Sequence, residues 1–226
     1  LRINRIFEGS SEIMKLLIAR EAVDAHLAAA GDLASEDASL SDKAKAAVGA
    51  SGFYAKWLPK LVAGAGMDPR SYSDFGRLAR QLRFVERSSR RLARQTFYGM
   101  GRWQAKLEHK QAFLGRIVDI GAELFAMAAC CSRAEMLLRT EPEKGASAYE
   151  LAEAYCEQAR VRVDEYFDQL WRNTDDGDHV LARNVLAGDY EWLEAGVLDQ
   201  SAGTGPWIAD ASPRASVKEN LHRKYR

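Results

Sequence analysis

The sequence predicts an all-α protein, a helical bundle of up-and-down topology. Apolar side chains recur at helical spacing almost throughout its 226 residues. The alternation of apolar and polar residues that marks strands joined by hairpin turns is not found in it. A chain of this length can bury a sizeable core, and it contains no run of about 18 apolar residues of the kind that crosses a membrane.

Charge and cysteine content narrow the possible functions. The 32 Lys and Arg residues balance the 32 Asp and Glu residues, so the chain lacks the global basic field that drives nonspecific nucleic-acid binding. We therefore expect no nucleic acid among its partners. The three cysteines show no Cys-x-x-Cys spacing and the four histidines stand far apart, so the sequence favours neither a disulfide framework nor a metal site.

The first expected helix begins near Ser10 or Ser11, because either hydroxyl can cap exposed backbone amides. It continues to about Ala30, and Gly31 closes it. Residues 31–42 then turn polar between two apolar-periodic stretches, which makes them the expected boundary of a new module.

Residues 42–63 form the next expected helix, which two glycines and Pro59 should weaken. Lysines mix there with a short cluster of aromatic residues, and this mixture allows two interpretations. The helix could lie in a membrane interface, or it could be a packed or disordered surface helix; the short cluster and the proline favour the second. The aromatic residues are Phe53, Tyr54 and Trp57.

A long helix should follow, beginning at Ser73 or Asp74 and ending near Leu107. Residues 113–138 predict another helix, and because they are apolar on nearly all sides we expect this helix to be the most buried element. Its apolar residues include Phe125.

The last expected helices come after a turn at residues 141–145. One runs from Ser147 to about Arg172, and a shorter one runs from Asp178 to Ala187, where Gly188 ends it. Residues 199–226 are rich in Gly, Ser, Pro and terminal basic residues, which is typical of a tail or arm.

Six arginines share one face of the long helix, and an acidic row lies at comparable steps on the helix expected from Ser147. The arrangement favours ion pairing between neighbouring helices or subunits over a patch for lipid, coenzyme A phosphates or nucleic acid. The arginines are Arg77, Arg80, Arg83, Arg87, Arg90 and Arg94. The acidic residues are Glu150, Glu153, Glu157, Asp164 and Asp168.

The most specific feature is residues 2–13, which read Arg-Ile-Asn-Arg-Ile-Phe-Glu-Gly-Ser-Ser-Glu-Ile. From spacing alone they would be an ordinary helix start, with Glu8 a solvated acid and the serines its caps. The stretch resembles the segment near the end of the catalytic domain of flavin-dependent acyl-CoA dehydrogenases that carries the catalytic base and part of the flavin site. Residues 107–133 are similar to the additional C-terminal helical domain of the very-long-chain branch of that family.

The resemblance implies roles for five residues. Glu8 would be the catalytic base that removes the α proton of an acyl-CoA thioester, and Gly9 would lie near that substrate. Ser10, Ser11 and Glu12 would contact FAD, which would accept the β hydride.

The resemblance also implies the organisation of the chain and its partners. Residues 1–35 would end the catalytic domain, residues 36–198 would form the added helical domain, and residues 199–226 would be the tail. The parent enzyme would desaturate fatty acyl-CoA between the α and β carbons in β-oxidation. It would pass electrons to electron-transfer flavoprotein and form a homodimer through the added domain.

Most of the flavin-binding and substrate-binding structure precedes the motif in this family, so we expect the isolated chain to be a fragment, inactive and without bound FAD. The expected location is the cytoplasm of a bacterium, with peripheral inner-membrane contact through residues 42–63 as an alternative, or the mitochondrion of a eukaryote. The competing functional class is a noncatalytic helical interaction or membrane-association module that retains the motif.

Overall fold

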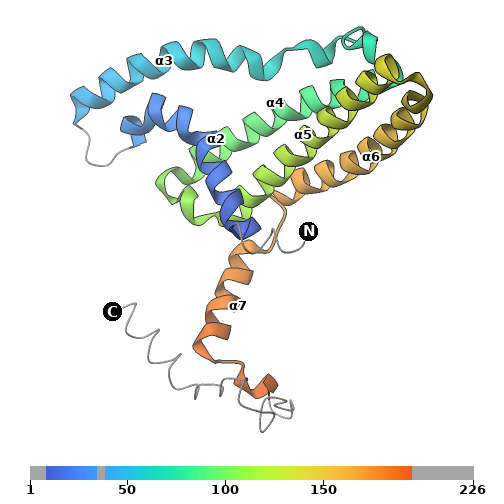
Figure 1. Cartoon of the computed structure of the whole chain (residues 1–226). Helices are drawn as coiled ribbons and strands as arrows, with labels where there is room; N and C mark the ends of the chain where they lie inside the picture. Colours follow the sequence, from blue (N-terminus) through green and yellow to red (C-terminus); the bar gives the residue numbers. More distant parts are fainter. Residues whose placement is uncertain (1–8, 35–38, 195–226) are drawn as a thin grey trace. The chain divides into compact units, whose positions relative to one another are not determined.

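Residues 9–34 and 39–194 are described by the computed structural model, and every regular element among them is helical (Figure 1). The all-α prediction is therefore confirmed. The chain divides into two compact units, Leu1–Arg172 and Asn173–Arg226. The first unit holds the helices α2 (Ser11–Ala34), α3 (Leu40–Val62), α4 (Ala79–Trp103), α5 (Gln111–Thr140) and α6 (Pro142–Gln169).

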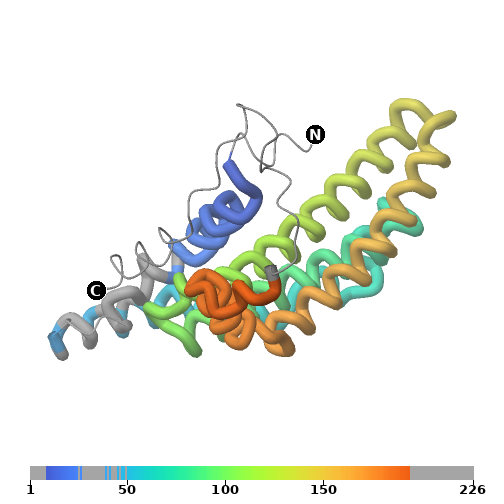
Figure 2. Tube along the Cα trace, turned by 90° about the horizontal axis from the view of Figure 1, so that it is seen from below, coloured from blue at the N-terminus to red at the C-terminus, as the bar shows by residue number. Residues whose placement is uncertain are grey.

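Helices α4, α5 and α6 run side by side and are joined at alternate ends, which gives the predicted up-and-down topology (Figures 1 and 2). Helix α5 contacts α2, α4 and α6, whereas α3 contacts α2 and α4. Among the described helices, none combines the length and the hydropathy needed to cross a bilayer.

Helix α5 is the core helix that its apolar sequence predicts. Ile120, Met127 and Cys131 are fully buried along it, in one apolar cluster with Cys156 and Val163 of α6. The Sγ atoms of Cys131 and Cys156 lie 3.7 Å apart, so even the polarisable side chains of the two helices are in contact. The expectation fails at three positions of this helix: Phe125 is 76% exposed, and Met136 and Leu138 near its end are exposed as well.

The long helix α4 begins later and ends earlier than the sequence predicts. Ser73 and Asp74 do not cap it; they lie in a 3₁₀ turn, Ser73–Leu78, in which Gly76 has a φ of 48°. Such a positive φ cannot continue a right-handed helix. At the other end Gln104 has a φ of 47°, and the chain passes into a second 3₁₀ turn, Gln104–His109.

Helices α2, α3 and α6 are longer than predicted. Gly31 does not end α2, which continues to Ala34. Pro59 does not interrupt α3: the helix continues through it and ends three residues later, at Val62. Helix α6 begins at Pro142 instead of Ser147, and a proline at the first helical position is compatible with the helix because its N–H would have no partner there.

The second unit contains helix α7 (Asp175–Ala187) and a 3₁₀ turn, Glu191–Glu194. Helix α7 starts three residues before the predicted Asp178, and acidic residues in its first turn complement the positive end of the helix dipole. Gly188, with a φ of 84°, ends it as expected. The predicted tail lies outside the described residues, and the domain limits predicted after residues 35 and 198 stay predictions.

The turn between α5 and α6 depends on a close approach at Gly145. A Cβ atom there would lie 2.5 Å from the Cα of Leu138, a backbone atom that cannot swing aside. We expect Gly145→Ala to lower the free energy of unfolding by about 1–3 kcal/mol in urea denaturation, because overpacking forces the two helices apart.

The matched control is Gly101→Ala in α4, where an added Cβ would meet nothing within 4 Å in the described part of the chain. That change should be neutral or stabilise the protein by up to about 1 kcal/mol through helix propensity. Equal free energies of unfolding for Gly145→Ala and Gly101→Ala would contradict the close approach of Gly145 to Leu138.

Candidate functional site

The motif residues that the structure describes form the start of α2. Glu8, the predicted catalytic base, lies outside the described residues. Gly9 has a φ of 105°, a conformation that favours glycine, and the chain turns there into the helix. Ser10 accepts a hydrogen bond from the backbone N–H of Ile13 at 3.4 Å, and its carbonyl accepts the first helical bond from Met14 at 3.1 Å. Of the two predicted capping residues, Ser10 is therefore the cap.

This helix start offers donors that suit the polar parts of a flavin nucleotide. The Ser10 hydroxyl accepts one hydrogen bond and keeps its own proton for donation. Ser11 is half-buried and Glu12 is exposed. Backbone amides at a helix start favour phosphate oxygens, whereas a carboxylate such as that of Glu12 suits a ribose hydroxyl. These residues therefore fit the group that the family resemblance implies.

The outward face of α2 next to the motif is apolar. Ala19 and Val23 are buried, but Ile13 and Leu17 are 61% and 50% exposed, and the neighbouring Ile18 is exposed too. A helix that is apolar on both faces is normally covered on both faces. The motif thus stands beside a surface that fits a further protein surface.

Helix α2 is fixed to the core helix by an ion pair as well as by packing. The ammonium nitrogen of Lys15 lies 2.8 Å from a carboxylate oxygen of Asp119 on α5. Both side chains are only about a third exposed or less, so the pair helps to define how α2 lies on α5.

The predicted pairing of the arginine row with the acidic row is correct for two arginines. Arg80 of α4 lies 3.0 Å from Glu153 and 2.5 Å from Glu157 on α6, and Arg77 lies 3.5 Å from Glu153. A third cation on this side, Arg91, was not part of the predicted row. It lies 3.7 Å from Asp164 and covers the ring of Phe167 at 4.1 Å.

In the described part of the chain the other four arginines do not reach the acidic row of α6, and three of them contact the connection between α3 and α4. Arg94 donates to the carbonyl of Leu61 at the end of α3, Arg87 donates to Gly66 at 2.7 Å, and Arg83 donates to Ser71 at 2.9 Å. Arg90 pairs with Glu86 on its own helix. Because steps of three residues fall short of a full turn, the row drifts around α4 and its two parts face different neighbours.

Glu86 contacts the same connection between α3 and α4, but as a hydrogen-bond acceptor, whereas the arginines are donors. Its carboxylate accepts the backbone N–H of Gly66 at 2.8 Å, while Arg87 donates to the Gly66 carbonyl. A Cβ on Gly66 would lie 2.8 Å from the Arg83 carbonyl oxygen, so only glycine fits this approach. Arg83, Arg87, Arg90 and Arg94 all have partners within the chain, which disfavours the alternative of an arginine patch for lipid or coenzyme A phosphates.

Residues 42–63 turn their aromatic side chains toward the bundle. The ring of Trp57 lies 4.6 Å from His26 of α2 and 5.4 Å from Phe97 of α4, measured between ring centroids. Phe53 and Tyr54 belong to the same cluster. The three rings are half-buried against α2 and α4, which favours the packed surface helix over the membrane-interface helix, because rings engaged in the bundle have less surface to offer a lipid interface.

Two carboxylates on α5 are held by partners within the bundle. Glu135 accepts hydrogen bonds from Tyr149 and Arg139, and the Tyr149 contact holds the pKa of Glu135 below its usual range. Burial raises the pKa of Tyr149 to about 12. The bidentate contact with Arg162 likewise lowers the pKa of Glu123. Such ionised, paired carboxylates stabilise helix contacts and are poor candidates for a proton-accepting base.

Comparisons with known proteins identify a matching family model and close relatives of the chain. Residues 78–185 match the model of the ACAD9/ACADV C-terminal domain family. The whole chain is 68% identical, over 225 residues, to the probable acyl-CoA dehydrogenase FadE10 of Mycobacterium tuberculosis and to that of Mycobacterium bovis. It spans 35% of the length of these curated relatives. No solved structure matches the chain significantly.

The fold and these matches define an all-α C-terminal region of a dehydrogenase. The chain matches the C-terminal part of an acyl-CoA dehydrogenase, the family that residues 2–13 and 107–133 predict. The predicted second similarity, residues 107–133, falls inside the matched range of 78–185.

The hydrogen bond from Arg87 to the Gly66 carbonyl can be tested with Arg87→Met, which keeps an aliphatic side chain and removes the donor. We expect faster hydrogen exchange at the Gly66 amide and a loss of about 1–3 kcal/mol, because a charge-assisted hydrogen bond disappears. Arg80→Met is the control, since Arg80 contacts the α6 glutamates and not this connection. If both variants leave exchange at residues 63–72 unchanged, the arginines do not hold the connection.

Proposed function

We propose that the complete protein is a flavin-dependent acyl-CoA dehydrogenase that desaturates fatty acyl-CoA between the α and β carbons, as in fatty acid β-oxidation. This chain would supply the catalytic base, Glu8, and part of the flavin site, and its remaining helices would form the added domain. The observation that carries the proposal is the start of α2, where Gly9 turns the chain into a helix capped by Ser10 beside an exposed apolar face.

The chemistry needs a base on one side of the thioester and an acceptor on the other. FAD, when bound, accepts the hydride from the β carbon. Glu8 would take the α proton, and a carboxylate gains the required basicity when an apolar, water-poor site raises its pKa. The exposed Ile13 and Leu17 next to the motif support such a site, since a covering protein surface would exclude water there.

Gly9 and the helix start would position the two ligands. A glycine at a φ of 105° lets the backbone approach the thioester closely. The Ser10 hydroxyl, which already accepts the Ile13 N–H, can donate to a nucleotide oxygen. Ser11 and Glu12 extend this polar edge along the first turn of α2.

We also propose the wider setting that the family implies. Electron-transfer flavoprotein would reoxidise the flavin, and the added domain would support a homodimer. Exposed apolar side chains on α6 support such an interface: Leu151 and Val161 are each more than two-thirds exposed. The location would be the bacterial cytoplasm, or the mitochondrion in a eukaryote, and the isolated chain would be inactive because most of the flavin site is supplied by other parts of the protein.

Glu8→Gln in the complete protein tests the catalytic assignment. This substitution removes the proton acceptor with little change in volume, so turnover of saturating acyl-CoA should fall by about 10²–10⁴-fold while the FAD content stays the same. Stopped-flow reduction of the flavin measures the step directly.

The matched control is Glu21→Gln, an exposed carboxylate further along α2, which should keep wild-type turnover. Retention of more than about a tenth of the wild-type rate by Glu8→Gln, with saturated flavin, would place the base at another residue.

A further inference from the structure

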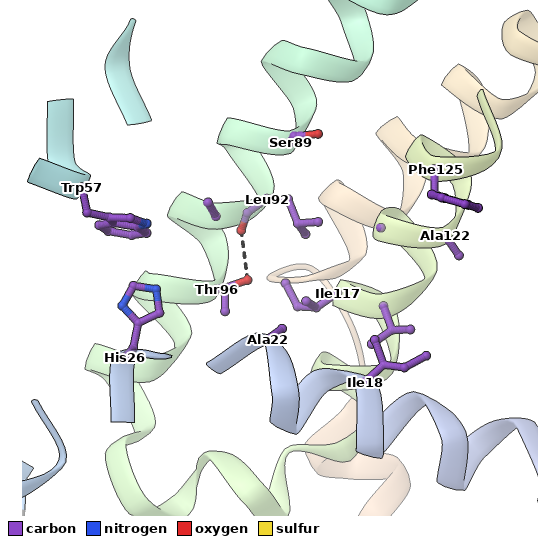
Figure 3. A pocket seen from close by; sticks show the side chains of 13 residues that line it. Ile18, Ala22, His26, Trp57, Ser89, Leu92, Thr96, Ile117, Ala122 and Phe125 are labelled. Atoms are coloured by element: carbon purple, nitrogen blue, oxygen red, sulfur yellow. Dashed lines mark hydrogen bonds between the residues drawn. The ribbon is translucent and has the colours of Figure 1, made fainter. Parts of the chain in front are cut away.

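An apolar pocket of about 530 Å³ lies between α2, α4 and α5, away from the start of α2 where the motif stands. Figure 3 shows it running from Trp57 and His26 at one end to Phe125 and Ile18 at the other. Its size falls within the range of about 300–1,000 Å³ that is typical of small-molecule sites. No charged side chain of the described residues lines it.

His26 is the polar group at the deep end of this pocket. Its side chain belongs to a residue only 9% exposed, and its Nδ1 has no hydrogen-bond partner among the described residues. Burial lowers the pKa of His26, so the ring is neutral near pH 7 and Nδ1 can take part in a hydrogen bond without a buried charge. A buried polar atom without a partner costs about 1–3 kcal/mol, which a ligand head group would recover.

The two hydroxyl side chains along the pocket already donate their protons. Thr96 donates to the carbonyl of Leu92 at 3.0 Å, and Ser89 donates to that of Val85 at 2.8 Å. Besides the indole of the half-buried Trp57, the polar group that remains in the described lining is the buried Nδ1 of His26. Ligand sites are commonly built in this way, from apolar walls and a few polar groups that fix orientation.

Small residues keep the middle of the pocket open. Gly121 lies inside α5, where a glycine costs about 1 kcal/mol relative to alanine. An added Cβ would meet its nearest neighbour, a Leu92 methyl, at an ordinary 3.8 Å, so packing does not require glycine there. The missing side chain instead leaves room between α4 and α5, next to Ala93 and Ala122.

Exposure changes along the pocket and sets the direction of a ligand. His26, Thr96 and Ile117 are buried, whereas Ile18 and Phe125 are more than half exposed. A ligand that reaches Nδ1 must carry its polar group at the buried end and its apolar part toward the open end. A bulky polar head such as coenzyme A would have to be buried against aromatic rings, which excludes it from this orientation.

We propose that this pocket binds a free fatty acid, with the acid group hydrogen-bonded to Nδ1 of His26 and the aliphatic chain lying along Gly121 toward Phe125. The acid and the imidazole share one proton, as a neutral pair or as an ion pair, so neither is left as an uncompensated buried charge. The site is distinct from the one proposed for the thioester at the start of α2, and it does not depend on Glu8.

Calorimetry with dodecanoic acid on the complete protein tests the proposal, with saturating dodecanoyl-CoA present to occupy a thioester site. We expect one molecule of acid bound per chain. Gly121→Leu fills the middle of the pocket and should weaken binding at least tenfold. Gly101→Leu makes the same change on the exposed end of α4 and should alter the affinity by less than twofold.

His26→Phe keeps a ring in the aromatic cluster and removes Nδ1. It should weaken dodecanoic acid about tenfold and dodecanol much less, because the alcohol cannot form the shared-proton pair. The proposal fails if the complete protein with dodecanoyl-CoA binds no acid, or if Gly121→Leu, folded by circular dichroism, binds as the wild type does.

A second measurement covers variants that fail to fold. In the wild-type protein, 2-bromododecanoic acid should quench Trp57 fluorescence, because its bromine lies beside the head group, whereas 12-bromododecanoic acid should not. The difference should vanish in Trp57→Phe. Equal quenching by the two acids would overturn the orientation, and with it the role of His26.

Discussion

Burial of helix α5 is the constraint on which the rest of the first unit depends. Three helices, α2, α4 and α6, contact it, and Ile120, Met127 and Cys131 have no exposed surface. One neighbouring helix cannot bury a helix that is apolar on nearly all sides, so several helices must pack against it. The close turn at Gly145 brings α6 back along it, and α4 completes the antiparallel row.

The packing on α5 also fixes the position of the helix that follows the motif residues. Helix α2 carries Gly9–Glu12 at its start, rests on α5, and is tied to Asp119 through Lys15. Further along the same helix, His26 belongs to the aromatic cluster with Trp57 of α3 and Phe97 of α4. The orientation of the motif helix is therefore set by the bundle over most of its length.

Helical periodicity predicted the helices of the first unit and the burial of α5, because apolar spacing reports directly on packing. It could not predict where helices end, since that depended on single backbone conformations such as the positive φ of Gly76 and Gln104. The arginine row was visible in the sequence, but its division between the α6 carboxylates and the backbone carbonyls of residues 61–71 depends on which neighbour each side faces. The exposure of Phe125 and the lack of a hydrogen-bond partner for Nδ1 of His26 among the described residues both depend on tertiary packing, so no local sequence pattern predicts them.

We expect the motif helix and the bundle to form one cooperative unit through α5. Native-state hydrogen exchange of the 226-residue chain measures this most directly, because it gives an opening free energy for each buried amide. Amides near Ala19 and Val23 of α2 should open together with those of α4, α5 and α6, at the same free energy. Opening of α2 in a separate unit of much lower stability would contradict it.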